Sequence, residues 1–200
     1  MDFTAIKQLK LKEAFQQHPL FDAIHADEDY LNVLFECDDK GTLYIIDDPE
    51  KKMSVFIPDT KGVGRDKTFV VTNRDHSSVL LWHIDGVLFK DNTKCDCAII
   101  TRKELDFIEF KTNARGSSRE AIISNYDKAF QQLLATIQEV TQRCASVGID
   151  IHSVVKEVSA YAVFNRTVPR LTTMQQSQAR KFLKATNGVK LHFMNHKTLL

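Results

Sequence analysis

The clearest hydrophobic pattern in the chain is a helical one in its second half. From about residue 118 to residue 145, apolar side chains recur every three or four positions, which predicts a long amphipathic helix. The preceding Ser117-Ser118-Arg119-Glu120 matches a capping box, in which serine and glutamate side chains bond free amides at a helix start. Gly148 suits the end of this helix. The apolar positions are Ile123, Tyr126, Phe130, Leu133, Ile137, Val140 and Cys144.

Short runs rich in β-branched and aromatic residues predict strands on both sides of this helix. Residues 47–50 supply the turn of a predicted hairpin between two of them. After the helix, residues 158–164 are apolar without alternation, as in a parallel strand that is covered on both faces. The strands predicted before the helix are 42–46, 53–57, 67–72, 78–84, 94–101 and 105–112.

Two further helices and one edge strand complete the pattern. Apolar positions in residues 3–17 indicate an N-terminal helix, whereas residues 29–35 fit either a helix or a strand. Thr173-Met174-Gln175-Gln176 matches a second capping box and opens a helix that ends near Asn187-Gly188. Residues 189–194 alternate apolar and polar side chains, as in a half-exposed edge strand.

The order of these elements from residue 78 onward is β-β-β-α-β-α-β. A strand, a long helix and a further strand form a crossover unit, which joins parallel strands. We therefore expect an α+β fold with an α/β core, in which residues 76–200 form a mixed sheet flanked by helices. Residues 1–75 are expected to be an N-terminal α+β elaboration packed on that core.

Composition narrows the class of protein. The chain has 200 residues, 43% of them hydrophobic and 26% charged, which is typical of a globular domain. No apolar run approaches the ~20 residues of a membrane-spanning helix, and no secretory signal is visible, so a cytoplasmic protein is expected. The four cysteines, Cys37, Cys95, Cys97 and Cys144, lack the spacing of a zinc knuckle and are expected to be free and buried. Cys95 and Cys97 are two residues apart, so we expect them on one face of a strand.

The net charge of +1 conceals an asymmetry along the chain. Residues 111–200 carry 13 Lys or Arg and 5 Asp or Glu, a net charge of +8, whereas residues 1–110 carry 14 and 21, a net charge of −7. Two interpretations stay open: two solvated faces of opposite sign, or a basic surface that meets a polyanion.

Three residues on neighbouring predicted strands carry candidate chemistry. Glu109 and Lys111 lie on one face of an otherwise apolar strand, where charges are costly unless they are paired, bind a metal or lie near an open strand end. Asp96 belongs to the preceding strand. Two converging carboxylates offer oxygen ligands for Mg²⁺, which polarises a phosphodiester and lowers the pKa of bound water. Lys111 would then hold or deprotonate the attacking water, or stabilise charge growing on the phosphate.

The register of these two strands decides whether Asp96 and Glu109 meet. We expect that pairing about a turn at residues 102–104 places Asp96 at the far end of its strand from Glu109. A longer or bulged connection would bring the two carboxylates together. The residue pattern leaves both arrangements open.

Asp96, the Glu109-Phe110-Lys111 triplet and the long helix after it resemble the PD-(D/E)xK nuclease superfamily, whose core is the restriction-endonuclease-like αβββαβ fold. The resemblance covers about residues 78–165, and Cys95 stands where the motif has proline. It implies a Mg²⁺-dependent DNA endonuclease, in which Mn²⁺ substitutes for Mg²⁺. It also implies that Asp96, Glu109 and Lys111 are catalytic, and that Asp96, Glu109 and the backbone carbonyl of Phe110 bind the metal.

The resemblance adds expectations about partners and supporting residues. It implies DNA as the substrate and a defence or mobile-element system as the setting, with a homodimer or a larger defence complex as the assembly. No membrane association is expected, because no apolar run is long enough to span a membrane. Some branches carry a glutamine on the following helix, for which Gln131 and Gln132 are the nearest candidates. Glu13 is the candidate for an acidic residue on the first helix. His83 and Asp85, on one strand face, are weaker candidates for the site.

Four arginines are expected to contact DNA phosphates. Arg115 and Arg119 follow Lys111 directly, and Arg166 and Arg170 follow the strand beyond the crossover. Because the ends of parallel strands joined by a crossover point the same way, all four would border one cleft. Ordinary solvated loop cations are the alternative for Arg115 and Arg119. Aromatic residues are not interleaved with basic ones, so no stacking platform for single strands is predicted.

Two rival functions stay open. The same fold without activity would be a module that binds nucleic acid or a protein partner. This reading is favoured if Asp96 and Glu109 lie far apart or if Lys111 points into the core. The second rival is a plain α+β interaction protein, in which Glu109 and Lys111 form a ladder of charges on the surface.

Overall fold

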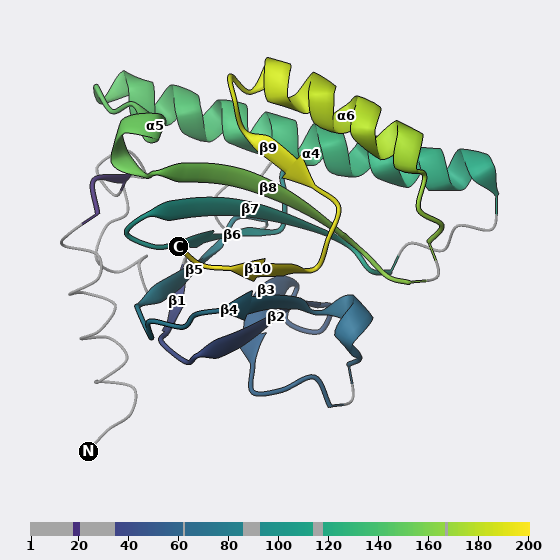
Figure 1. Cartoon of the computed structure of the whole chain (residues 1–200), viewed down its shortest axis with the longest axis horizontal. Helices are drawn as coiled ribbons and strands as arrows, with labels where there is room; N and C mark the ends of the chain where they lie inside the picture. Colours follow the sequence, from purple (N-terminus) through teal and green to yellow (C-terminus); the bar gives the residue numbers. More distant parts are fainter. Residues whose placement is uncertain (1–17, 21–34, 62, 86–92, 114–117, 167) are drawn as a thin grey trace.

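The computed structural model describes residues 18–20, 35–61, 63–85, 93–113, 118–166 and 168–200. Their elements form three layers, with two long helices above a six-stranded sheet and a four-stranded sheet below it (Figure 1). The helix predicted in residues 3–17, and with it Glu13, lies outside the described residues. The chain therefore has an α+β fold with mixed sheets, as predicted.

The large sheet has the strand order β1-β5-β6-β7-β8-β9. From β1 to β7 each strand is antiparallel to its neighbour, whereas β7, β8 and β9 run parallel. As predicted, β8 is buried between two parallel neighbours and β9 is an edge strand. The strands are β1 (Phe35–Asp38), β5 (Val79–His83), β6 (Cys97–Ile100), β7 (Glu104–Lys111), β8 (Glu157–Phe164) and β9 (Lys190–His192).

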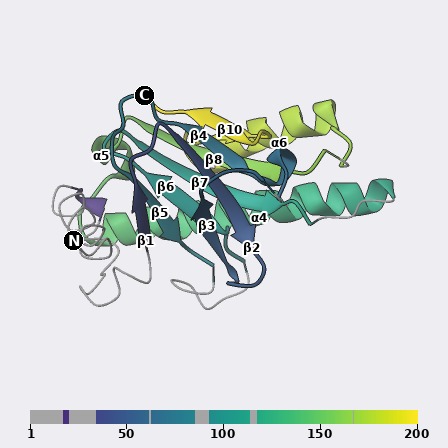
Figure 2. The ribbon, with the colours of Figure 1, turned by 90° about the horizontal axis from the view of Figure 1, so that it is seen from below.

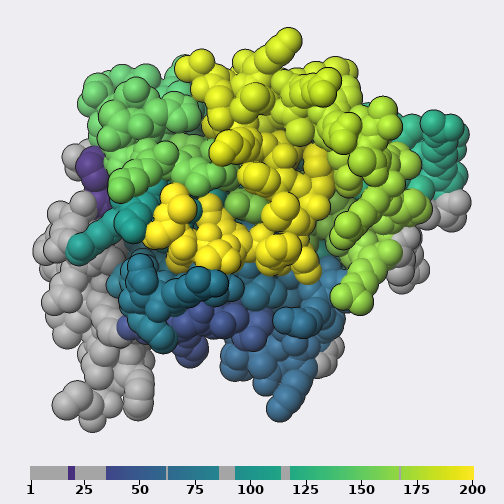
Figure 3. All heavy atoms as spheres, in the orientation of Figure 1, coloured from purple at the N-terminus to yellow at the C-terminus, as the bar shows by residue number. Residues whose placement is uncertain are grey.

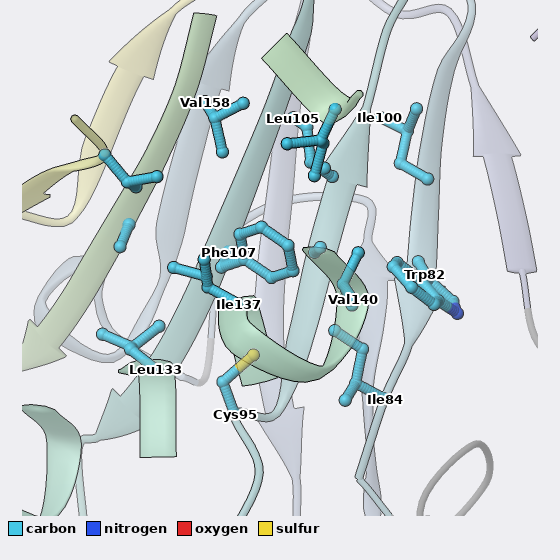
Figure 4. Close-up of a cluster of buried hydrophobic side chains, with 14 of the residues drawn as sticks. Trp82, Ile84, Cys95, Ile100, Leu105, Phe107, Leu133, Ile137, Val140 and Val158 are labelled. Atoms are coloured by element: carbon cyan, nitrogen blue, oxygen red, sulfur yellow. The ribbon is translucent and has the colours of Figure 1, made fainter. Parts of the chain in front are cut away.

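Both long helices cover one face of the large sheet. Helix α4 (Arg119–Ser146) joins β7 to β8, with the short α5 (Ile151–Val154) after it, and α6 (Thr172–Ala185) joins β8 to β9. Leu133 and Ile137 of α4 share a buried cluster with Phe107 of β7 (Figure 4). Because side chains alternate along a strand, the odd-numbered residues of β7 face α4.

The opposite face of the large sheet packs on the small sheet, which has the order β10-β4-β2-β3. Figure 2 views the molecule from this side. Ile45 and Val71 of the small sheet share a buried cluster with Ile99 and Ile108 of the large one. The strands are β2 (Thr42–Asp48), β3 (Met53–Ile57), β4 (Phe69–Thr72) and β10 (His196–Thr198), with a single 3₁₀ turn, η1 (Arg65–Lys67), before β4.

Strands from both sides of residue 75 contribute to both sheets. β1 pairs with β5 in the large sheet, and β10 pairs with β4 in the small one. The division into residues 1–75 and 76–200 stays a prediction. These two strand pairs connect the two predicted parts. None of the described helices has the length and apolar character needed to cross a membrane.

The two predicted capping boxes were wrong in detail. The cap of α4 is Ser118 and not Ser117: the Ser118 side chain accepts a hydrogen bond from the amide of Ala121 at 3.2 Å. The cap of α6 is Leu171, without a side-chain hydrogen bond, since Thr173 already lies inside the first turn. Gly148 does follow the end of α4, with a positive φ of 78° that glycine adopts readily.

All four cysteines are free, and all but the half-buried Cys37 are buried. The expectation that Cys95 and Cys97 share one strand face was wrong. Cys95 packs in the cluster beneath α4, whereas Cys97 packs in the cluster between the sheets. The chain bends at Asp96, immediately before β6 begins, so strand alternation does not extend back to Cys95.

Candidate active site

The register of the β6–β7 hairpin sets the geometry of the site. Ile100 pairs with Leu105 and Cys97 with Ile108, and this register, continued by one residue beyond β6, brings Asp96 to Glu109. The expectation that a tight turn would hold these two carboxylates apart was wrong. The amide of Thr101 donates to the carbonyl of Glu104 at 2.9 Å, which leaves a two-residue turn. Counting outward from that turn brings Asp96 to Glu109 without any bulge.

Asp96 is held between two strands at the bend before β6. One of its carboxylate oxygens accepts a hydrogen bond from the backbone amide of Phe110 at 2.5 Å. Its backbone carbonyl accepts from the amides of Ile84 and Asp85 at 3.2 and 3.3 Å. The carboxylate is therefore fixed beside the Glu109-Phe110-Lys111 segment of β7.

Glu109 and Lys111 lie under helix α4. Glu109 is 1% exposed, and Lys111 forms an ion pair with its Oε1. The Lys111 ammonium also donates to Oε1 of Gln132 at 2.6 Å. The Gln132 amide in turn donates to the backbone carbonyl of Lys94 at 2.9 Å. Of the two glutamine candidates, the structure brings Gln132 to Lys111.

Helix α4 also fixes the segment that carries Asp96. The hydroxyl of Thr136 accepts the backbone amide of Cys95 at 2.8 Å and donates to the carbonyl of Gln132 at the same distance. Thr136 is completely buried. One turn of α4 thus holds both Lys111 and the residue before Asp96. Nothing in the sequence pattern singles out Thr136, which occupies the apolar stripe of the helix.

The two carboxyl groups bear the electrostatic cost of burial. Burial raises the pKa of Asp96 to about 7, although the Phe110 amide opposes the shift. Burial, and next the charge of Asp96, raise the pKa of Glu109 well above its usual value, against the opposing effect of Lys111. Oε2 of Glu109 is buried without a hydrogen-bond partner. Lys111 therefore pairs with only one of the two carboxylate oxygens of Glu109, and the other is left without a donor.

Two further acids border the site from neighbouring strands. Asp47, at the end of β2, and Asp85, just after β5, line a cavity of about 190 Å³ together with Asp96. Burial, and then the charges of Asp85 and Asp48, raise the pKa of Asp47. The prediction that Asp47 lies in the hairpin turn was wrong, because it lies in β2, and its place beside Asp96 was not predicted. The acidic run at residues 47–50 was its only signal.

The donor set suits a hard divalent cation. Mg²⁺ is held in proteins by one or two carboxylates, with waters and substrate phosphate oxygens completing its ligands. Asp96, Glu109 and the carbonyl of Phe110 offer oxygen donors of this kind, and the orphaned Oε2 of Glu109 is one of them. Among the described residues, no three His, Cys, Asp or Glu side chains are grouped to hold a metal ion by themselves.

The remaining predicted residues fall in several places. Arg115 lies outside the described residues, and Arg119 is exposed at the start of α4. Arg166 and Arg170 are exposed after β8, whose last residue, Phe164, pairs with Lys111. They therefore follow the same end of the large sheet as Lys111. His83 is 2% exposed, and by strand alternation its side chain faces the small sheet.

Comparison with known proteins adds no family assignment to this geometry. No protein-family model, curated protein or solved structure matches the chain.

Proposed function

We propose that the protein is a Mg²⁺-dependent endonuclease that hydrolyses DNA phosphodiester bonds, on a restriction-endonuclease-like core of the PD-(D/E)xK type. The observation that carries this proposal is the place of the Asp96 carboxylate on the Glu109-Phe110-Lys111 segment, where the Phe110 amide holds it, with Lys111 held by Glu109 and Gln132. Two carboxylates and an ammonium group supply metal ligands, a means of generating the nucleophile and neutralisation of phosphate charge.

The arrangement of elements supports the same reading. Strands β5, β6 and β7 form an antiparallel meander, and α4 then crosses over to β8, which pairs in parallel with β7. This is the βββαβ part of the expected core. On this reading β1 to β4 belong to the elaboration and β10 of the core completes the small sheet, which brings Asp47 to the edge of the site.

Each residue of the candidate active site has a separate task in the proposed reaction. Asp96 and Glu109 would bind Mg²⁺, which when bound polarises the phosphodiester and lowers the pKa of water. The Lys111 ammonium orients the attacking water or neutralises charge that develops on the phosphate. Gln132 is a positioning residue, because it holds that ammonium from α4. The Phe110 amide orients the Asp96 carboxylate.

The test is cleavage of a supercoiled plasmid with Mg²⁺, with Mn²⁺ and with a chelator. Cleavage is expected with either metal and not with the chelator. Lys111→Ala, Asp96→Asn and Glu109→Gln should each lower the rate by at least about 100-fold. Lys128→Ala removes an exposed lysine from α4 and should leave the rate unchanged. Equal cleavage by the Lys111→Ala variant and the wild type would overturn the assignment.

A second outcome would favour the rival module. If the wild type binds DNA but cleaves none of it in either metal, the enzyme proposal fails and the inactive nuclease-fold module takes its place. The Asp96 carboxylate on the Phe110 amide, and the contacts of Lys111 with Glu109 and Gln132, support the enzyme over the rival.

A further inference from the structure

A second cavity, of about 420 Å³, opens beyond the end of β8. Segments that lie far apart in the sequence form it: η1, α4, the end of β8 with its connection to α6, and, last, the residues after β9. Figure 3 shows the last two, in yellow-green and yellow, meeting on one face of the molecule. Val168 of the connection belongs to a buried cluster with Tyr126, and Phe193 after β9 packs against that cluster.

Aromatic rings line this cavity. Tyr126 of α4 stacks on Phe164 of β8, with ring centroids 4.4 Å apart and planes inclined by 28°. Phe193 lies 5.5 Å from the Tyr126 ring. The Tyr126 hydroxyl donates to the carbonyl of Pro169 at 3.3 Å and accepts from the Gln175 side chain at 2.9 Å. The rings are thus fixed before any ligand arrives, so a flat group could stack without reorganising them.

The polar part of the lining is mixed in charge. Arg166 and Arg170 are exposed and place two guanidinium groups beside the rings. Asp66 of η1 offers a carboxylate, and Asn195 offers an amide group. A ligand that carries both an anion and hydrogen-bonding edges on an aromatic plane fits this lining better than a simple anion does.

The cavity adjoins the candidate active site. Phe164 is the cross-strand partner of Lys111 in the parallel β7–β8 pair, and neighbouring strands lie about 4.8 Å apart. The Asn165 side chain donates to the carbonyl of Thr112 at 2.6 Å, which ties the two strand ends together. A DNA strand whose phosphate lies at Lys111 would therefore carry a neighbouring nucleotide to this cavity.

We propose that the cavity binds one unpaired nucleotide of the DNA strand that is cut at Lys111. The base stacks on Phe164 and Phe193, and Arg166 and Arg170 hold its phosphate. A base within a duplex does not present its face to a protein ring, so the substrate is single-stranded or locally unpaired DNA. This inference rests on the proposed function, since it deepens the substrate class of the same site.

The first experiment measures binding without cleavage, by fluorescence anisotropy in a chelator. The probes are a labelled oligodeoxythymidylate and an abasic oligodeoxynucleotide of the same length. Stacking of one base is worth ~1–3 kcal/mol, so the wild type should bind the first probe about 5- to 150-fold more tightly. Phe193→Leu should remove most of this preference. Phe56→Leu, which changes a half-buried ring on β3, is the matched control and should keep it.

The second experiment isolates the phosphate contact. Arg166→Gln should lower the affinity for both probes by the same factor. It should also lower the slope of log affinity against log salt by about 0.7. Arg180→Gln removes an exposed arginine from α6, away from the cavity, and should change neither quantity. Since Arg166 is exposed, this variant keeps the test valid if Phe193→Leu disturbs folding.

The outcomes separate this inference from the proposed function. Equal binding of the two probes by the wild type, or the same preference in the Phe193→Leu and Phe56→Leu variants, overturns the nucleotide site even if Mg²⁺-dependent cleavage is present. A preference that Phe193→Leu removes supports the site, and if no cleavage accompanies it with Mg²⁺, the nuclease proposal alone fails.

Discussion

At the scale of single residues, the buried carboxyl groups tie the stability of the protein to pH. Burial raises the pKa of Asp96 to about 7 and that of Glu109 well above its usual value. Burial likewise raises the pKa of Asp106 to about 7, against the effect of Lys197. Between pH 4 and pH 7 the folded protein therefore binds more protons than the unfolded chain, and stability falls as pH rises through this window.

We predict that Asp96 and Asp106 each lower the free energy of unfolding of the metal-free protein by about 2 kcal/mol between pH 5 and pH 7. Urea unfolding at a series of pH values measures this slope. Asp96→Asn should make the slope shallower, because amide replaces the titrating group. Asp75→Asn, at an exposed position, is the control. A slope of the opposite sign, or one that Asp96→Asn leaves unchanged, contradicts the prediction.

Divalent metal should reverse the same effect. A cation between Asp96 and Glu109 favours their charged forms, so Mg²⁺ should raise the melting temperature more at pH 8 than at pH 5. Calorimetric titration should show binding to the wild type and none to Asp96→Asn or Glu109→Gln. Equal affinity in all three proteins would remove these residues from the metal site.

At the scale of elements, α4 organises the site through Thr136. Its hydroxyl is the partner of the buried Cys95 amide, and Thr136→Val would leave that amide unpaired within nearly the same volume. We predict a loss of ~1–3 kcal/mol in the free energy of unfolding, whereas Thr136→Ser should keep most of the stability. Urea unfolding compares the two. Equal losses, or a larger loss for Thr136→Ser, would mean that the hydroxyl contributes no more to stability than the methyl group does.

Elements with strong local patterns could be predicted from the sequence, and those fixed by distant pairing could not. The stripe from Ile123 to Cys144 predicts α4 because the apolar positions sit on one helix face. The opposition of Asp96 and Glu109 was also within reach, since it follows from counting along a two-residue turn. β10 has only three residues, and its place is set by pairing with β4.

The site residues that were missed came from that same distant packing. Asp47 reaches the site only because the small sheet covers the large one. The aromatic cavity joins Tyr126, Phe164 and Phe193, which no local pattern of basic and aromatic residues connects. The bend at Asp96 broke the alternation from which the direction of Cys95 was inferred.

At the scale of the whole molecule, Lys197 joins the two sheets. Its side chain, on β10 of the small sheet, is 5% exposed, and its ammonium lies 2.7 Å from Glu104 and 2.9 Å from Asp106 of β7. Lys197→Met would leave two buried acids without their cation. We predict a loss of ~3–5 kcal/mol in the free energy of unfolding, measured by urea unfolding.

Lys190 provides the matched control for this change. Its side chain is 64% exposed and lies 3.8 Å from Glu157. A surface pair of this kind contributes ~0–1 kcal/mol, so Lys190→Met should have little effect. Similar losses for the two variants would mean that the buried pair of acids does not depend on Lys197.

The parallel pairing of β10 with β4 also governs the order in which the chain can assemble. β4 is bonded to β2 on one side and to β10 on the other, yet residues 196–198 leave the ribosome after every other described strand. Until they arrive, β4 presents an open row of amides and carbonyls, which is a template for pairing with another chain. Sequence-distant pairing of this sort is also slow to form. A chain interrupted before residue 196 would thus be exposed to edge-to-edge aggregation through β4.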